Sequence, residues 1–155
     1  MPQSEVNASK AAFAAVQAEL ASRNLGHFVR AAWSVVEPST PFVDGWHIGL
    51  VCEYLQAVLD LEINNLIINL PPRHMKSLLA SVFFPAYSWV KQPGLRWLGG
   101  SFALPLAIRD AQRTRRLVGS DWYQAAFGRS FAILPGHDQK HRYQNDRGGG
   151  RLAFG

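Results

Sequence analysis

Residues 65–77 read NLIINLPPRHMKS, a mostly apolar run followed by a turn with two prolines and then by Lys76 and Ser77. The run at 66–70 predicts a buried strand of the kind found in parallel sheets. The apolar residues 78–90 that follow predict a helix. Strand, loop, Lys-Ser and helix is the order of a phosphate-binding P-loop, in which loop N–H groups and the helix N-terminus face an anion. In such a loop Lys76 reaches the terminal phosphates and the Ser77 hydroxyl holds Mg²⁺.

The loop departs from the standard pattern G-x-x-x-x-G-K-[ST] at both glycines, since Leu70 and Met75 occupy their places. Glycine permits unusual backbone angles and a close approach of the chain to phosphate. A methionine at position 75 requires either ordinary backbone angles or strain, and it leaves less room for a ligand. The sequence therefore predicts weak nucleotide binding.

Residues 66–79 resemble the Walker A region of the large terminase subunits of tailed phages, the ATP-driven motors that package viral DNA. In that family the loop often reads Pro-Pro-Arg-His-Gly-Lys-Ser, and methionine in the glycine place is a familiar variant. Three other segments resemble family elements in the same order: FVDGWHI at 42–48, GSDWY at 119–123 and NDRGGGRLA at 145–153. The resemblance covers residues 28–155.

The resemblance implies ATP and Mg²⁺ as cofactors and assigns roles to particular residues. The phosphate loop would consist of Pro72, Arg73, His74, Met75, Lys76 and Ser77, with Mg²⁺ on Ser77. Lys76 and Arg73 would be catalytic, because a guanidinium beside the γ-phosphate stabilises charge that develops during phosphoryl transfer. Trp46 and His47 would lie near the adenine. The plainer alternatives are a solvated Arg73 and a Trp46–His47 pair that belongs to the core.

Composition describes a folded chain with a basic surface. The 155 residues are 48% apolar and 17% charged, with a net charge of +5, which favours a polyanionic partner such as nucleic acid. Arg109, Arg113 and Arg116 share one face of a predicted helix, and they face DNA, a neighbouring subunit or simply solvent. No apolar run is long enough to span a membrane. The single Cys52 excludes an internal disulfide and fits a reducing cytosol.

The predicted architecture is an α/β fold: a partial P-loop NTPase domain, with a mainly parallel sheet and flanking helices, over residues 25–155. A helical tail, with Ser9 as a plausible N-cap, precedes it over residues 1–24. The predicted helices cover residues 11–20, 25–36, 47–61, 78–90 (interrupted at Pro85), 105–118 and 121–127. The predicted strands cover residues 66–70, 95–101, 142–145 and 151–154, the last two being antiparallel around three glycines.

ATP hydrolysis also needs a strand that ends in acidic residues, to complete the Mg²⁺ site and activate water. No such strand follows Lys76 in the sequence. In the family it comes after the Gly-Gly-x-Arg strand and precedes a nuclease domain. We therefore expect the N-terminal part of a terminase ATPase domain, which ends before that strand, binds ATP and has little turnover alone.

The resemblance also implies partners and a location. The partners would be double-stranded DNA, the terminase small subunit, the portal protein and further copies of the full-length chain, in the host cytoplasm and without a membrane. Two alternatives remain: another P-loop enzyme, such as a helicase or small-molecule kinase, and a non-enzymatic basic module that binds DNA or a motor subunit. A zinc site at His137 and His141 is a weaker possibility, because no convincing helix would bring the two together.

Overall fold

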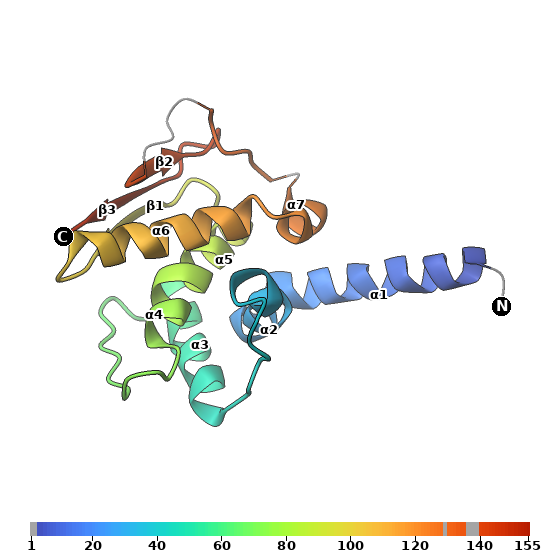
Figure 1. Cartoon of the computed structure of the whole chain (residues 1–155), viewed down its shortest axis with the longest axis horizontal. Coiled ribbons are helices and arrows are strands. Elements are labelled where there is room, and N and C mark those ends of the chain that lie inside the picture. The colour runs from blue at the N-terminus through green and yellow to red at the C-terminus, as the bar shows by residue number, and fades with distance from the viewer. Residues whose placement is uncertain (1–2, 129, 136–139) are drawn as a thin grey trace.

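The computed structural model describes residues 3–128, 130–135 and 140–155, and it is rich in helix (Figure 1). The helices are α1 (Gln3–Arg23), α2 (Leu25–Val36), α3 (Trp46–Leu59), α4 (Lys76–Leu78), the π-helical turn η1 (Leu79–Phe83), α5 (Phe84–Lys91), α6 (Leu104–Val118) and α7 (Asp121–Phe127). The strands are β1 (Arg96–Gly100), β2 (Arg142–Gln144) and β3 (Gly150–Phe154). Within the described ranges, no helix has both the length and the apolar character needed to cross a bilayer.

The three strands form a small mixed sheet in the order β1-β3-β2, with β1 parallel and β2 antiparallel to β3. Trp97, Arg151 and Tyr143 lie side by side across the strands on the face that packs against the helices. The neighbouring Leu98 and Leu152 lie on the opposite face, where they are 66% and 40% exposed. This alternation is that of a sheet covered on one side only.

The predicted mainly parallel P-loop sheet is wrong. Residues 66–70 run extended but pair with no strand, and Figure 1 places them beside α3 and away from the three strands. Their side chains explain the error: Leu66, Ile68 and Leu70 pack on the core, whereas Ile67 is 93% exposed. An apolar run predicts burial, but it does not determine which backbone supplies the hydrogen bonds. β3 pairs with one edge of β1. In the described part of the chain, residues 66–70 form no strand pairing with the other edge of β1.

The helix after the loop starts at Lys76, two residues earlier than predicted, and it contains the expected interruption near Pro85. The interruption is the π turn η1, in which the Phe84 N–H bonds to the Leu79 carbonyl, five residues back. Pro85 then occupies the first turn of α5, where its missing N–H and fixed φ are tolerated. The three elements α4, η1 and α5 therefore form one continuous helical run over residues 76–91.

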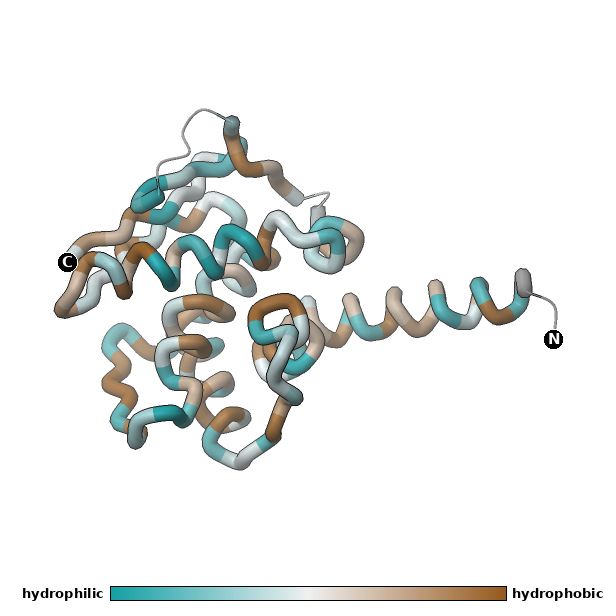
Figure 2. Tube along the Cα trace, viewed as in Figure 1, coloured by the Kyte–Doolittle hydropathy of each residue, from teal (hydrophilic) through white to brown (hydrophobic). Residues whose placement is uncertain are grey.

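The N-terminal helix α1 is longer than predicted, and Ser9 lies inside it rather than at its N-cap. Only its last turns reach the body of the molecule, where Ala21 is fully buried. The rest projects outward, and Figure 2 shows hydrophilic and hydrophobic residues interspersed along it. Phe13 and Val16 are 67% and 57% exposed as a consequence.

An aromatic cluster holds the helices together below the sheet. The Phe28 ring of α2 packs edge-on against Tyr87 of α5 and against Trp122 and Tyr123 of α7, at centroid distances of 5.6 to 6.2 Å. The buried Tyr123 hydroxyl donates to the Ala86 carbonyl at 2.9 Å. The predicted helices at 25–36 and 121–127 are confirmed by α2 and α7, and the strand predictions at 95–101, 142–145 and 151–154 by β1, β2 and β3.

Candidate functional site

The loop between the extended segment 66–70 and the helical run has an unusual backbone. Arg73 has φ 66° and Met75 has φ 60°, both in the left-handed region that glycine adopts freely. Such a conformation costs a non-glycine residue about 1–2 kcal/mol. Met75 therefore has a strained backbone. It stands in the place of the second glycine of the P-loop pattern and adopts the left-handed conformation that a glycine would adopt freely.

Lys76 and Ser77 follow directly as the first two residues of the helical run, and both side chains are exposed. The first N–H groups of a helix have no acceptor inside the helix, and they carry its positive dipole end. Pro71 and Pro72 have no N–H, so residues 73–77 supply the donors of the loop. One exposed helix start thus carries backbone donors, an ammonium group and a hydroxyl on neighbouring residues, a combination that suits phosphate.

His74 connects the loop to the start of α3. Its Nδ1 lies 2.9 Å from the Pro72 carbonyl oxygen, which closes the turn upon itself. Its ring packs edge-on against the ring of His47, with centroids 5.4 Å apart. Trp46 precedes His47 on α3 and is 81% exposed. The structure therefore brings the Trp46–His47 segment to the loop, although His74 lies 28 and 27 positions further along the sequence.

An ion pair fixes the turn from which α3 starts. The Arg30 guanidinium of α2 contacts Asp44 Oδ2 at 2.7 Å, and Asp44 Oδ1 accepts from the Gly45 N–H at 2.9 Å. The hydrogen bond from Arg30 lowers the pKa of the Asp44 carboxyl below its ordinary value of 3.8. Asp44 is exposed, so the pair orients this turn more than it stabilises the fold.

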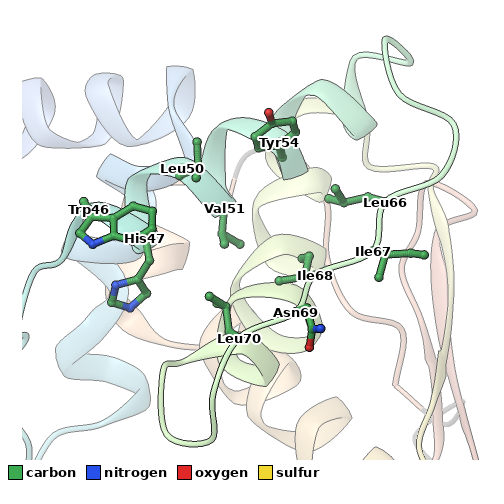
Figure 3. A pocket seen from close by; sticks show the side chains of 10 residues that line it. All are labelled: Trp46, His47, Leu50, Val51, Tyr54, Leu66, Ile67, Ile68, Asn69 and Leu70. Atoms are coloured by element: carbon green, nitrogen blue, oxygen red, sulfur yellow. The ribbon is translucent and has the colours of Figure 1, made fainter.

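A groove of about 350 Å³ lies between α3 and the extended segment that leads into the loop (Figure 3). In this view Leu66, Ile68 and Leu70 point toward α3, whereas Ile67 points away from it. The lining comes from one face of α3 and from the segment: Trp46, His47, Leu50, Val51, Tyr54, Leu66, Ile67, Ile68, Asn69 and Leu70. Because Leu70 immediately precedes the loop, an apolar groove and a phosphate-type loop are adjacent.

The arginines of α6 occupy a different part of the molecule. Arg109 pairs with the neighbouring Asp110 at 2.9 Å, and Arg113 pairs with Glu37, beyond the end of α2, at 3.1 Å. Arg116 is exposed near the end of α6. Two of the three predicted DNA-contacting arginines are thus already committed to carboxylates, and contact with DNA or with another subunit stays a prediction.

Two segments of the family resemblance have structural roles here. Ser120 caps α7 by accepting from the Tyr123 N–H at 3.2 Å. Asn145 organises the turn between β2 and β3: its Oδ1 accepts from Gly149 N at 2.8 Å, and its Nδ2 donates to Pro93 O at 2.8 Å. A Cβ at Gly149 would lie 2.0 Å from that Pro93 oxygen, so no larger residue fits. These residues build the fold around the site and do not line the loop.

Arg151 is the residue whose setting the sequence does not predict. It lies on β3, is only 4% exposed and donates to the Ser81 carbonyl at 2.7 Å. Arginine is seldom buried, so the only signal in the sequence is its place in an alternating strand of otherwise apolar and small residues. Of the suggested zinc pair, His137 lies outside the described residues, and His141 is exposed.

Comparison with models of protein families, with curated protein sequences and with solved structures finds no match to this chain. The terminase resemblance therefore depends on the quoted motifs alone.

Proposed function

We propose that this chain binds the phosphates of a magnesium nucleotide at residues 72–77 and acts as an ATP-binding component of a phage DNA-packaging motor. One observation carries the phosphate-binding part of the proposal, and the role in a motor rests on the family resemblance alone. Met75, in the place of a P-loop glycine, adopts the left-handed conformation directly ahead of Lys76 and Ser77 at the start of a helical run. The left-handed conformation is unfavourable for a methionine and persists only where the surrounding structure imposes it. Such strain concentrates at functional sites.

Each group has a chemical role in this proposal. Loop N–H groups and the Lys76 ammonium bind the terminal phosphates, while the exposed Arg73 guanidinium can approach the γ-phosphate. The Ser77 hydroxyl fits one coordination position of Mg²⁺, whose other ligands would be phosphate oxygens and water. Mg²⁺, where bound, supplies charge neutralisation at the phosphates.

The base would occupy the apolar groove beside the loop. The groove is lined by the aromatic rings of Trp46, His47 and Tyr54 and by aliphatic side chains, which suit a planar heterocycle. Its position next to the loop supports a nucleotide over inorganic phosphate as the ligand. Double-stranded DNA, the terminase small subunit and the portal protein are proposed as partners of the motor on the family resemblance alone.

Titration calorimetry with Mg-ATP tests the loop. Lys76→Ala should abolish most of the binding, because it removes the main point charge aimed at the phosphates. Lys91→Ala is the matched control, since Lys91 is also exposed but lies at the opposite end of the same helical run. Equal affinities for wild type and Lys76→Ala would refute the assignment of the loop.

A second comparison separates the groove from the loop. Trp46→Ala should weaken the binding of Mg-ATP but leave the binding of inorganic triphosphate unchanged. Weakening of both ligands alike would show that Trp46 acts by holding the loop and not by contacting the base.

A further inference from the structure

The helical run that carries Lys76 and Ser77 departs from regular α-helical hydrogen bonding at its middle. In an uninterrupted α-helix the N–H of residue 85 would bond to the carbonyl of Ser81, but Pro85 has no N–H. The π turn η1 replaces the regular pattern here. Carbonyls in this part of the run lie in the protein interior, where an unsatisfied acceptor costs free energy.

Two side chains from other elements reach these carbonyls. Arg151 of β3 donates through Nη2 to the Ser81 carbonyl at 2.7 Å and through Nη1 to the hydroxyl of Thr114. Thr114 is fully buried on α6, and its single hydroxyl proton has three carbonyl oxygens within reach: Asp110 at 3.1 Å, Ser81 at 3.2 Å and Val82 at 3.3 Å. Side chains of a strand and of a helix thus meet at the π turn and place hydrogen-bond donors beside its carbonyls.

Burial of the Arg151 guanidinium beside the π turn costs free energy. In the described residues no carboxylate lies within ion-pairing distance of Arg151, and its buried Nε has no hydrogen-bond partner. Burial lowers the pKa of Arg151, while Tyr143 and the Asp110 carboxylate of α6 act in the opposite direction. A buried cation without a salt bridge is unfavourable unless its hydrogen bonds are needed. Two of its hydrogen bonds go to the Ser81 carbonyl of the π turn and to Thr114, which contacts the same turn.

We propose that Arg151 and Thr114 are positioning residues for the phosphate-binding end of this helical run, an inference that rests on the function proposed above. A π turn inserts one residue, and one residue corresponds to about 100° of rotation along a helix. If the turn moved or dissolved, the segment that carries Lys76 and Ser77 would rotate relative to the groove and to His47. By holding the turn between Leu79 and Phe83, the two donors set the direction in which Lys76 and Ser77 face.

Amide hydrogen exchange of the nucleotide-free chain gives the first test. Arg151→Met, which keeps the length of the side chain and removes the donors, should speed exchange in residues 76–84 about tenfold. The Ser81 carbonyl then loses its charged donor, and a hydrogen bond of that kind changes an equilibrium constant by about one order of magnitude. Helix α3 is the internal control and should exchange as in wild type. Unchanged exchange in residues 76–84, or an equal rise in α3, would overturn the inference.

The second test measures the Mg-ATP affinity of Thr114 variants in which Arg151 is unchanged. Thr114→Val should weaken Mg-ATP binding about tenfold at a temperature at which every variant is folded, whereas Thr114→Ser, which keeps the hydroxyl, should bind as wild type does. If wild type and Thr114→Val bind equally, the positioning role fails and the proposed function stands. If wild type itself does not bind, both fail.

Discussion

Replacing Met75 by glycine and by alanine gives a direct test of the strained loop. Both substitutions remove the same half-buried side chain, so the loss of packing cancels when the two variants are compared. At φ 60°, the left-handed backbone still destabilises the folded alanine variant by about 1–2 kcal/mol. Glycine avoids that cost but adds about 0.4–1 kcal/mol of unfolded-chain entropy. The difference predicts that Met75→Gly is more stable than Met75→Ala by about 1 kcal/mol.

The sign of this difference is the informative quantity. At an ordinary helical position alanine is more stable than glycine by about 1 kcal/mol. Glu53, exposed in the middle of α3, provides that reference in the same protein. Urea unfolding of the four variants at positions 53 and 75 should therefore give opposite orders at the two sites. Alanine equal to or more stable than glycine at position 75 would refute the left-handed conformation and the argument built on it.

Three further outcomes are expected. Burial raises the pKa of Cys52 from 9.0 to about 12, so the stability given by its neutral thiol is complete below pH 9 and is lost as the pH rises from 9 toward 12. Between pH 9 and 11, the free energy of unfolding of wild type should therefore fall more steeply than that of Cys52→Ala, by up to about 1.4 kcal/mol per pH unit; parallel curves would contradict this. If Arg109, Arg113 and Arg116 meet DNA phosphates, changing all three to glutamine should flatten the dependence of DNA affinity on salt, measured by fluorescence titration, and an unchanged slope would leave them as a solvated face. ATP turnover of the purified chain should not exceed that of Lys76→Ala, because no described strand ends in an acidic pair, and robust Mg²⁺-dependent turnover that Lys76→Ala abolishes would contradict this.

The sequence predicts the local structure best where one residue determines the conformation. Pro38 ends the region of α2, Ser120 starts α7, and Gly148, with φ 81°, permits the turn between β2 and β3. These signals act within a few residues, so no knowledge of the tertiary structure is needed to use them.

The errors arise where a distant partner decides. Residues 66–70 have the composition of a buried strand, but whether they join a sheet depends on a free strand edge that the composition does not describe. The break at Pro85 is predicted, but the buried Arg151 that bonds to its π turn lies 66 residues further along the chain. For the site, the resemblance predicts that residues 72–77 and the Trp46–His47 segment lie near one ligand, and the structure shows a ring contact between His74 and His47. The left-handed Met75 requires the three-dimensional backbone.

The projecting helix α1 has a mechanical consequence. Its 21 residues correspond to about 30 Å, and only the C-terminal end is anchored, against α2 and the core. A rotation of about 10° at that anchor would displace the far end by about 5 Å, given the 1.5 Å rise per residue. Because α2 also holds the turn before α3 through Arg30 and Asp44, any rotation of α2 that accompanied a change in the groove wall would be largest at the tip of α1. A fluorophore near the exposed Phe13 would convert such changes into a distance signal.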